Sequence, residues 1–261
     1  MSIDPTRLFD AHMHTEFAHC SEDTSIGAVI ERMGTLGVES FGIVEHADQL
    51  YFPAEGFWHR PDTNRLEAMR RARAEGQSRH EEFRGRIRPL RSDRLFAGLE
   101  CEPEASGTGL AVLEEDLRGY DYLIGGLHFL EKPAERELTD AETARRFMAR
   151  TEQLVRSGID ILAHPFRIFR RQQRAAPAEH YGPVAEMLAA EGVAAEVNFH
   201  TNQPDPAFFR ICLERGVRLS IGSDAHNLTQ IGDLREHVLF LEKLGVAGRI
   251  EEILWKPPAT P

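Results

Sequence analysis

The sequence has few cysteines, no long apolar run and no N-terminal leader, and each shortage narrows the class of protein. The three cysteines, Cys20, Cys101 and Cys212, are odd in number and far apart, which favours reduced thiols over a disulfide framework. No stretch approaches the roughly 20 apolar residues of a membrane span, and the first residues lack a basic region followed by an apolar core. We therefore expect a cytoplasmic protein without a membrane segment.

Positive charge is also scarce. The chain carries 31 Lys and Arg against 42 Asp and Glu, a formal net charge of −11 at pH 7. This balance disfavours a broad basic surface, so a stable complex with nucleic acid is not expected. Bound divalent cations would, however, make an active cleft locally positive whatever the overall charge. The sequence gives no indication of the oligomeric state.

The chain has no repeat, low-complexity tract or long linker, and its 261 residues fit a single barrel domain over residues 1–261. Short apolar runs alternate with longer helical patterns, which predicts a parallel sheet. The first strand–helix turn lacks G-x-G-x-x-G, which argues against dinucleotide binding. Strands are expected at residues 8–11, 40–44, 95–99, 122–127, 159–163, 194–197 and 218–222. Helices are expected at residues 26–36, 65–80, 110–117, 141–155, 184–190, 207–214 and 234–244.

Seven strands are one fewer than a standard α/β barrel contains, so we expect a distorted barrel, with an open doubly wound sheet as the alternative. The longest irregular stretch, residues 48–64, follows the second predicted strand and is rich in aromatic residues. Long ordered loops in compact domains are usually functional. This one is either a lid over a polar site or an ordinary packed loop.

Histidines and carboxylates follow six of the seven predicted strands. The C-terminal ends of parallel strands share one rim, where barrels build their active sites. Residues i and i+2 of a strand point to the same side, so His12 and His14 aim together, as do Asp224 and His226. Imidazoles and carboxylates without a thiolate suit Zn²⁺, Mn²⁺ or Fe ions. The groups on this rim are His12, His14, His19, His46, Glu100, His128, His164, Asp224 and His226.

Each group alone has an ordinary structural explanation. The S-D-A-H at residues 223–226, for example, could simply cap a helix. Their agreement on one rim is what favours a metal centre. Cys20 and Cys101 adjoin candidate ligands, but neighbours in an extended strand face opposite ways, so neither is expected to bind metal.

The motifs resemble those of the PHP family, the polymerase and histidinol phosphatase superfamily of metal-dependent phosphoesterases. They are D-A-H-M-H-T at 10–15, V-E-H at 44–46, G-L-E at 98–100, G-L-H at 126–128, A-H-P at 163–165 and G-S-D-A-H at 222–226. The resemblance implies a distorted (β/α)₇ barrel, similar to a TIM barrel, with its active site at the C-terminal ends of the strands. Glu45 stands where the family usually has Asp, and Asp10 is expected to orient a liganding histidine rather than bind metal.

The resemblance also implies three divalent metal ions, which would be Zn, Mn or Fe. The first ion would be held by His12, His14, Glu100 and Asp224. The second would be held by His128 and His164 together with Glu100 as a bridge. The third would be held by His19, His46 and His226. The residues expected to act in catalysis are His12, His14, Glu100, Asp224 and His226.

Such a centre suits hydrolysis of a phosphate monoester, because the ions neutralise phosphoryl oxygens and turn a bridging water into a hydroxide nucleophile. On the side of the phosphate away from the metals, Arg167 is the first candidate for binding, since guanidinium binds phosphate in bidentate fashion. Arg170, Arg171 and Arg174 are expected on a solvated helix face. Asn198 and His200, after the sixth predicted strand, are candidate substrate contacts.

Histidinol phosphate leads the expected small phosphorylated substrates, although residues 200–206 lack the basic residue expected of a committed histidinol phosphatase. Phosphodiesterase or nucleotide phosphoesterase activity is the alternative within the family. An amidohydrolase-type C–N hydrolase also begins with H-x-H, but many carry a bridging lysine where this chain has His128. A non-catalytic metal-binding module would be expected to lack ligands, and none of the nine is missing.

Overall fold

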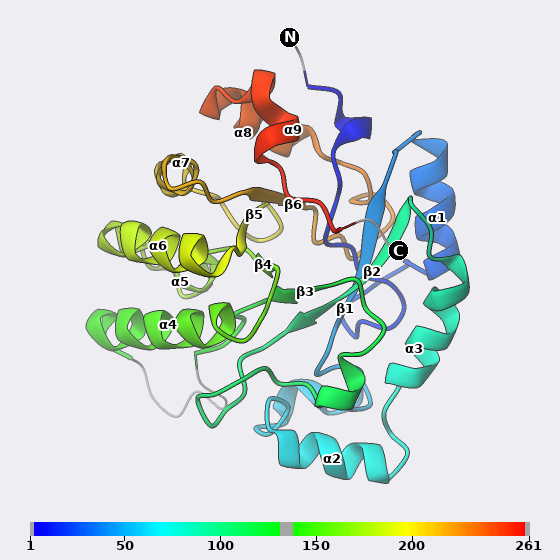
Figure 1. Ribbon diagram of the computed structural model, residues 1–261. Helices are drawn as coiled ribbons and strands as arrows, with labels where there is room; N and C mark the ends of the chain where they lie inside the picture. The colour runs from blue at the N-terminus through cyan, green and yellow to red at the C-terminus, as the bar shows by residue number, and fades with distance from the viewer. Residues whose placement is uncertain (1–2, 131–137, 259–261) are drawn as a thin grey trace.

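The computed structural model describes residues 3–130 and 138–258, and one parallel sheet organises them (Figure 1). Its six strands pair in sequence order, so all their C-terminal ends meet at one rim. The strands are β1 (Phe41–His46), β2 (Leu95–Cys101), β3 (Tyr122–Gly125), β4 (Ile161–Leu162), β5 (Ala194–Asn198) and β6 (Leu219–Gly222). Each overlaps a predicted strand.

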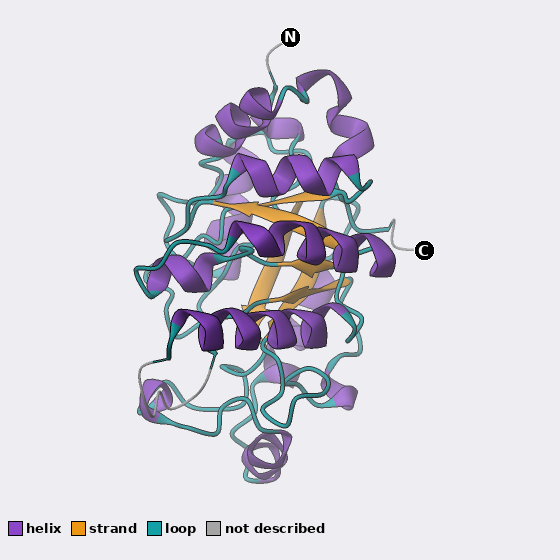
Figure 2. Cartoon of the chain, turned by 90° about the vertical axis from the view of Figure 1, so that its left-hand side faces the viewer, coloured by secondary structure: helices purple, strands orange, loops and turns teal. Residues whose placement is uncertain are grey.

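Helices cover the outer face of the sheet (Figures 1 and 2). They are α1 (Ile26–Thr35), α2 (Leu66–Ala74), α3 (His80–Ile87), α4 (Asp140–Val155), α5 (Arg167–Arg171), α6 (Tyr181–Glu191), α7 (Pro206–Glu214), α8 (Arg235–Leu244) and α9 (Ile250–Ile253). Short 3-10 turns occur at Pro5–Arg7, Phe57–His59, Arg88–Leu90, Glu114–Asp116, Ala178–His180 and Ala247–Arg249. Within the described ranges, no helix combines the length and apolarity that crossing a membrane requires.

Two predicted helices differ from the structure. The helix predicted over 65–80 is divided into α2 and α3, because Gly76 adopts φ +75° just after α2 ends. The helix predicted over 110–117 was wrong apart from one 3-10 turn. Leu110 instead forms a β-bridge with Pro103, and the Ala111 N–H donates to the Glu102 carbonyl at 2.8 Å. Pairing with residues 102–103 therefore replaces the helix that the apolar periodicity of residues 110–117 predicted.

Residues 8–14 join the two edges of the sheet without forming a regular strand, which corrects the seven-strand count. Asp10 forms isolated bridges to Phe41 of β1 and Ile221 of β6, and Met13 bridges Ala225. The Asp10 side chain also accepts from the backbone N–H groups of His12 (3.2 Å) and Ser223 (3.0 Å), which locally replaces a ladder of backbone bonds. The expected distorted barrel is confirmed, with six regular strands and this bridging segment.

A small apolar cluster fills the N-terminal half of the barrel interior. Phe9, Phe96, Tyr122 and Trp255 are among its buried members. The Tyr122 hydroxyl donates to the Ala11 carbonyl at 2.7 Å, and a Cβ at Gly42 would collide with that hydroxyl. Because the cluster occupies this half, the polar side chains of the barrel lie at the opposite, C-terminal end.

We expect Gly42→Ala to lower the free energy of unfolding by about 2 kcal/mol, because the added methyl group overpacks the interior against Tyr122. Urea unfolding followed by circular dichroism measures the change. Gly34→Ala is the matched control, since Gly34 is exposed in α1 with open space around it, and should stabilise by about 0.5–1 kcal/mol. Equal stability of Gly42→Ala and the wild type would contradict the packing argument.

Candidate metal centre

The Glu100 carboxylate lies at the C-terminal end of β2, and one of its oxygens faces three histidines. Oε2 lies 2.8 Å from His46 Nδ1, 3.3 Å from His12 Nε2 and 3.7 Å from His14 Nε2. The Glu100 side chain is 1% exposed, so water does not solvate this charge. A buried carboxylate is stable only when charges or hydrogen bonds compensate it.

The other Glu100 oxygen faces two more histidines from neighbouring strands. Oε1 lies 3.0 Å from His164 Nε2 and 3.4 Å from His128 Nε2. A Cβ at Gly126 would contact this same oxygen, so the glycine after β3 makes room for the carboxylate. Glu100 therefore contacts ligands on both sides, as the predicted bridging role requires.

Asp224 lies two residues after the end of β6 and contacts His12 and His14 of the cluster. Its Oδ1 lies 3.2 Å from His14 Nε2 and 3.8 Å from His12 Nε2. Asp224 has φ +53° and His164 has φ +30°, a left-handed backbone region that non-glycine residues rarely occupy. Such strain is typical of functional sites, where the surrounding structure holds it in place.

The donor atoms of this cluster fit divalent cations. Several are buried and make no hydrogen bond within the described part of the chain: His12 Nε2, both ring nitrogens of His14, and Glu100 Oε2. Buried polar atoms without a partner are rare unless they bind something. Three sets of donor atoms lie within 4.8 Å of one another: His12 with His14 and Glu100, His46 with Glu100 and His128, and His14 with His46 and His226.

The pKa shifts of His14, His164 and Glu100 keep these groups in the deprotonated form that binds a cation. Burial lowers the pKa of His164 to about 3 and that of His14 well below its usual value, so both imidazoles are neutral. The Glu100 carboxyl is desolvated too, but the surrounding histidines hold its pKa well below the usual range. At His12, burial is outweighed by the facing carboxylates of Glu196 and Glu100, which raise its pKa. A cation must therefore displace a proton there.

Two carboxylates that the sequence analysis missed contact histidines of the cluster through the ring nitrogen opposite Glu100. Glu196, in β5, lies 2.8 Å from His12 Nδ1 through Oε1 and accepts from the His164 backbone N–H at 2.7 Å. Glu102 lies 2.5 Å from His128 Nδ1. Each contact leaves the other ring nitrogen free for the cluster, as in many metal sites. The sequence does contain a signal for each: Glu196 is a carboxylate within the otherwise apolar run of residues 194–197, and Glu102 follows Glu100 at the i, i+2 spacing of residues that share a side.

Asp10 and Glu45, the two carboxylates discussed from the sequence, accept hydrogen bonds from backbone N–H groups rather than from imidazole rings. Asp10 fixes the backbone of His12 and Ser223 as described above, and burial raises its pKa to about 6. Glu45 accepts from the Thr15 N–H at 2.9 Å and hydroxyl at 2.5 Å, while its Oε2 lies 4.0 Å from His14 Nδ1. Asp10 therefore orients the His12 main chain, which refines the role expected for it.

The turn after His14 brings Cys20, rather than His19, beside the cluster. His19 Nε2 lies 3.0 Å from the Phe52 carbonyl oxygen, whereas Cys20 Sγ lies 3.5 Å from His46 Nε2. The expectation that Cys20 faces away assumed an extended strand. Residues 15–21 instead make two turns, closed by hydrogen bonds from the backbone N–H of Ala18 to Thr15 and of Ser21 to Ala18. The other eight predicted ligands come together, and His19 does not join them.

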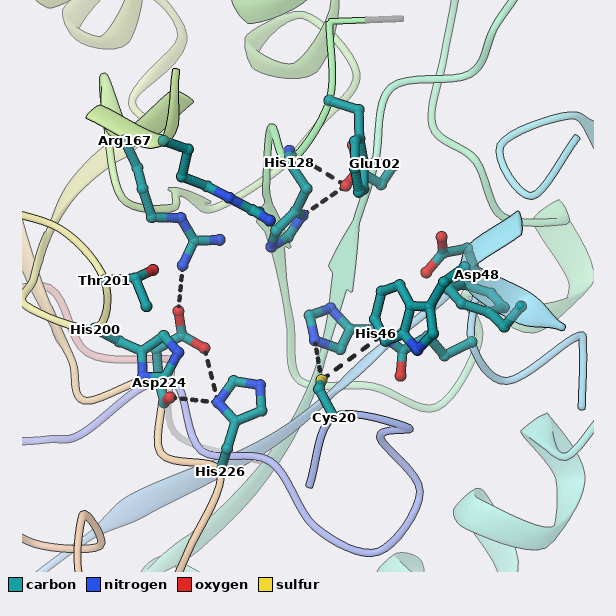
Figure 3. Close-up of a pocket in the computed structure, with 15 residues that line it drawn as sticks. Cys20, His46, Asp48, Glu102, His128, Arg167, His200, Thr201, Asp224 and His226 are labelled. Atoms are coloured by element: carbon teal, nitrogen blue, oxygen red, sulfur yellow. Dashed lines mark hydrogen bonds and ion pairs between the residues drawn. The ribbon is translucent and has the colours of Figure 1, made fainter. Parts of the chain in front are cut away.

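The cluster opens into a cavity of about 230 Å³ (Figure 3). Arg167, from α5, lines it and is only 3% exposed, with Nη1 2.8 Å from Asp224 Oδ2. His200 also lines it, and its ring stacks on that of His226 with the centroids 4.7 Å apart. Two of the three predicted substrate contacts, Arg167 and His200, therefore reach the cavity.

Asn198 lies behind the cavity instead of lining it. Its side-chain amide donates to Glu196 Oε2 at 3.1 Å and to Asp224 Oδ2 at 3.3 Å. Asn198 is fully buried, so the expected substrate contact is replaced by a role in holding two carboxylates. The three arginines after Arg167, all expected on a solvated helix face, differ in their contacts. Arg171 lines the cavity, whereas Arg170 donates to Gln203 at 2.8 Å and Arg174 pairs with Asp140.

The aromatic loop 48–64 both packs and lines the cavity. Tyr51 and Phe52 are fully buried, and the Tyr51 hydroxyl donates to Asp116 at 2.7 Å. Phe57 and Trp58 reach the cavity, and Trp58 is 57% exposed. The loop therefore forms part of the cavity wall.

Comparison with known proteins places the chain in a family. Residues 10–200 match the PHP domain, and the protein belongs to this family. It is 26% identical over 246 residues to a protein named probable histidinol-phosphatase from Deinococcus radiodurans, covering 87% of this chain and 89% of that one. The resemblance noted in the sequence is thereby confirmed.

Solved structures show the same fold. The histidinol phosphate phosphatase of Lactococcus lactis subsp. lactis Il1403, solved with zinc, L-histidinol and phosphate, has a TM-score of 0.59 at 15% identity, covering 92% of this chain and 94% of that one. The putative histidinol phosphatase of Listeria monocytogenes has a TM-score of 0.59 at 12% identity, covering 88% and 99%.

We expect Glu196→Gln to weaken metal binding about 10- to 100-fold, because the amide no longer offers His12 Nδ1 a charged acceptor. Competition for Zn²⁺ against a fluorescent chelator measures the affinity. Glu186→Gln is the matched control, since Glu186 pairs only with Arg215 on the surface at 3.1 Å among the contacts described. An unchanged affinity in Glu196→Gln would contradict the supporting role of this carboxylate.

Proposed function

We propose that the protein is a metal-dependent phosphatase that hydrolyses a phosphate monoester, with histidinol phosphate as its leading substrate. The observation that carries the proposal is the convergence of eight imidazole and carboxylate ligands, centred on Glu100, at the floor of a cavity that also contains Arg167. Membership of the PHP family and the name of the Deinococcus relative support the same activity.

We assign the ligands to three ions as the resemblance implies, except that His19 lies outside the cluster. His12, His14, Glu100 and Asp224 would hold one ion, and Glu100, His128 and His164 a second, while His46 and His226 belong to a third. Ions held by these residues would supply positive charge for the phosphoryl oxygens and activate water for hydrolysis near neutral pH. His12 Nε2, the two ring nitrogens of His14 and Glu100 Oε2 make no hydrogen bond within the described residues, which fits this assignment.

The remaining groups of the cavity bind and orient the substrate. Arg167 donates to Asp224 through one nitrogen, and its buried Nε makes no hydrogen bond within residues 3–130 and 138–258. That donor is available for a phosphoryl oxygen, so the guanidinium would contact a ligand and substrate together. His200, stacked on His226, is placed to contact the phosphate or the leaving group.

The cavity lining favours a small cationic or aromatic alcohol as leaving group. Asp48 lines the cavity together with Glu102, which also contacts His128, and Phe57, Trp58 and Phe129 supply aromatic surface. Histidinol carries an amine and an imidazole, which match both features. A nucleoside leaving group carries no positive charge to pair with these carboxylates, and for this reason nucleotide and diester hydrolysis stay the alternatives.

The test is a metal analysis combined with a substrate panel. Protein stripped with chelator should be inactive, and Zn²⁺ or Mn²⁺ should restore hydrolysis of histidinol phosphate above that of AMP and p-nitrophenyl phosphate, because the metals supply the nucleophile. Phosphate release and mass-spectrometric metal content are the measurements. Activity on bis-p-nitrophenyl phosphate alone would favour the diesterase alternative. Inactivity of fully loaded protein on every ester would refute the proposal.

We expect Arg167→Lys to lower kcat/KM about 10- to 100-fold, because an ammonium cannot contact Asp224 and a phosphoryl oxygen as a guanidinium fork does. Steady-state kinetics on the best substrate measure the loss. Arg170→Lys, three residues further along α5 and paired with Gln203, is the control and should change kcat/KM less than about twofold. Equal kinetics in the two variants would exclude Arg167 from phosphate binding.

A further inference from the structure

Both ring nitrogens of His19 face groups outside the cluster. Nε2 donates to the Phe52 carbonyl at 3.0 Å, and Nδ1 faces the Arg79 guanidinium, with Nη2 3.4 Å away. The guanidinium is itself fixed, because the same nitrogen donates to the carbonyls of Phe17 (3.0 Å) and Gln49 (2.9 Å). An arginine that is permanently charged also repels a cation at this position.

The backbone of the turn fixes this arrangement. The His19 N–H donates to Gln49 Oε1 at 2.5 Å, and the His19 ring packs edge-on against Phe57 at 5.1 Å between centroids. Bringing the imidazole to the cluster would break these contacts together. The next side chain along the turn, Cys20, is the one that lines the cavity.

Cys20 lies against two of the three histidines that share the outer part of the cluster. Its Sγ is 3.5 Å from His46 Nε2, the nitrogen opposite the one that faces Glu100 (Figure 3). Cys20 and His226 line the same cavity, and His226 Nδ1 donates to the Asp224 carbonyl at 2.7 Å, which leaves Nε2 without this partner. His14, fully buried with both nitrogens unpartnered in the described residues, lies in the same set as His46 and His226.

We infer that the Cys20 thiolate binds the third metal ion together with His46 and His226, in place of the predicted ligand His19. The inference rests on the metal centre of the proposed function. On binding, the thiol releases its proton to solvent and the sulfur donates a lone pair to the cation, with no change in oxidation state. A thiolate with two imidazoles selects Zn²⁺ over Mn²⁺ at this position, whereas the other two positions have only nitrogen and oxygen donors.

The experiment loads the full-length protein with Co²⁺, which replaces zinc and reports a bound thiolate by a charge-transfer absorption in the near ultraviolet. The wild type should show this band and bind three ions per chain. Cys20→Ala should lose the band and one ion, and His19→Ala should keep both. Cys20→His should keep the ion count without the band, because an imidazole can replace the sulfur donor.

A second measurement on the wild type keeps the test decisive if Cys20→Ala does not fold. Iodoacetamide labelling, mapped by peptide, should reach Cys20 at least tenfold more slowly in the Zn²⁺-loaded protein than in the chelator-treated protein. Cys101 and Cys212 are fully buried and serve as internal controls that should stay unlabelled in both.

Two results would overturn the inference: a wild type without the charge-transfer band, or loss of one ion in His19→Ala but not in Cys20→Ala. Labelling of Cys20 at equal rates with and without metal would also contradict it. Failure of the proposed function is separable. A protein that shows the band but hydrolyses no phosphate ester keeps the thiolate ligand and loses the phosphatase assignment, and hydrolysis without the band does the reverse.

Discussion

The Glu100 carboxylate, buried among five imidazoles, sets the conditions that the rest of the centre meets. Its charge has no water around it, so the neighbouring strands must deliver compensating groups to both oxygens. His12, His46 and His164 do so from three directions, and Gly126 leaves the space that the carboxylate occupies.

The backbone is irregular at several residues of the cluster. Residues 8–14 bridge both edges of the sheet through isolated pairs, and this segment carries His12 and His14. His164 and Asp224 take left-handed backbone angles at the ends of their strands. Buried acceptors hold these distortions: Asp10 takes the N–H groups of His12 and Ser223, and Glu196 takes that of His164. The irregular backbone therefore depends on the buried carboxylates of Asp10 and Glu196, which accept its hydrogen bonds.

The sequence predicts the parts of this protein that depend on periodicity and order along the chain. Apolar runs locate all six strands, and the groups that follow them identify eight residues that the fold brings together. The polar layer behind the ligands was missed, because Glu196 and Glu102 differ from ordinary carboxylates only through contacts made across the barrel. The exchange of His19 for Cys20 depends on two consecutive turns, and alternation along a strand does not describe a turn.

The bridging segment also has a consequence for how the centre assembles. Asp10 pairs with Ile221, and the Ser223 N–H donates to Asp10, so the segment that carries His12 and His14 docks on residues more than two hundred positions further along the chain. Contacts between residues so distant in sequence carry a large loop-closure cost and form late in folding. The groups predicted to hold the first ion come from both halves of the chain, and they lie together only in the closed barrel. A partly folded chain would hold an incomplete set of these donors.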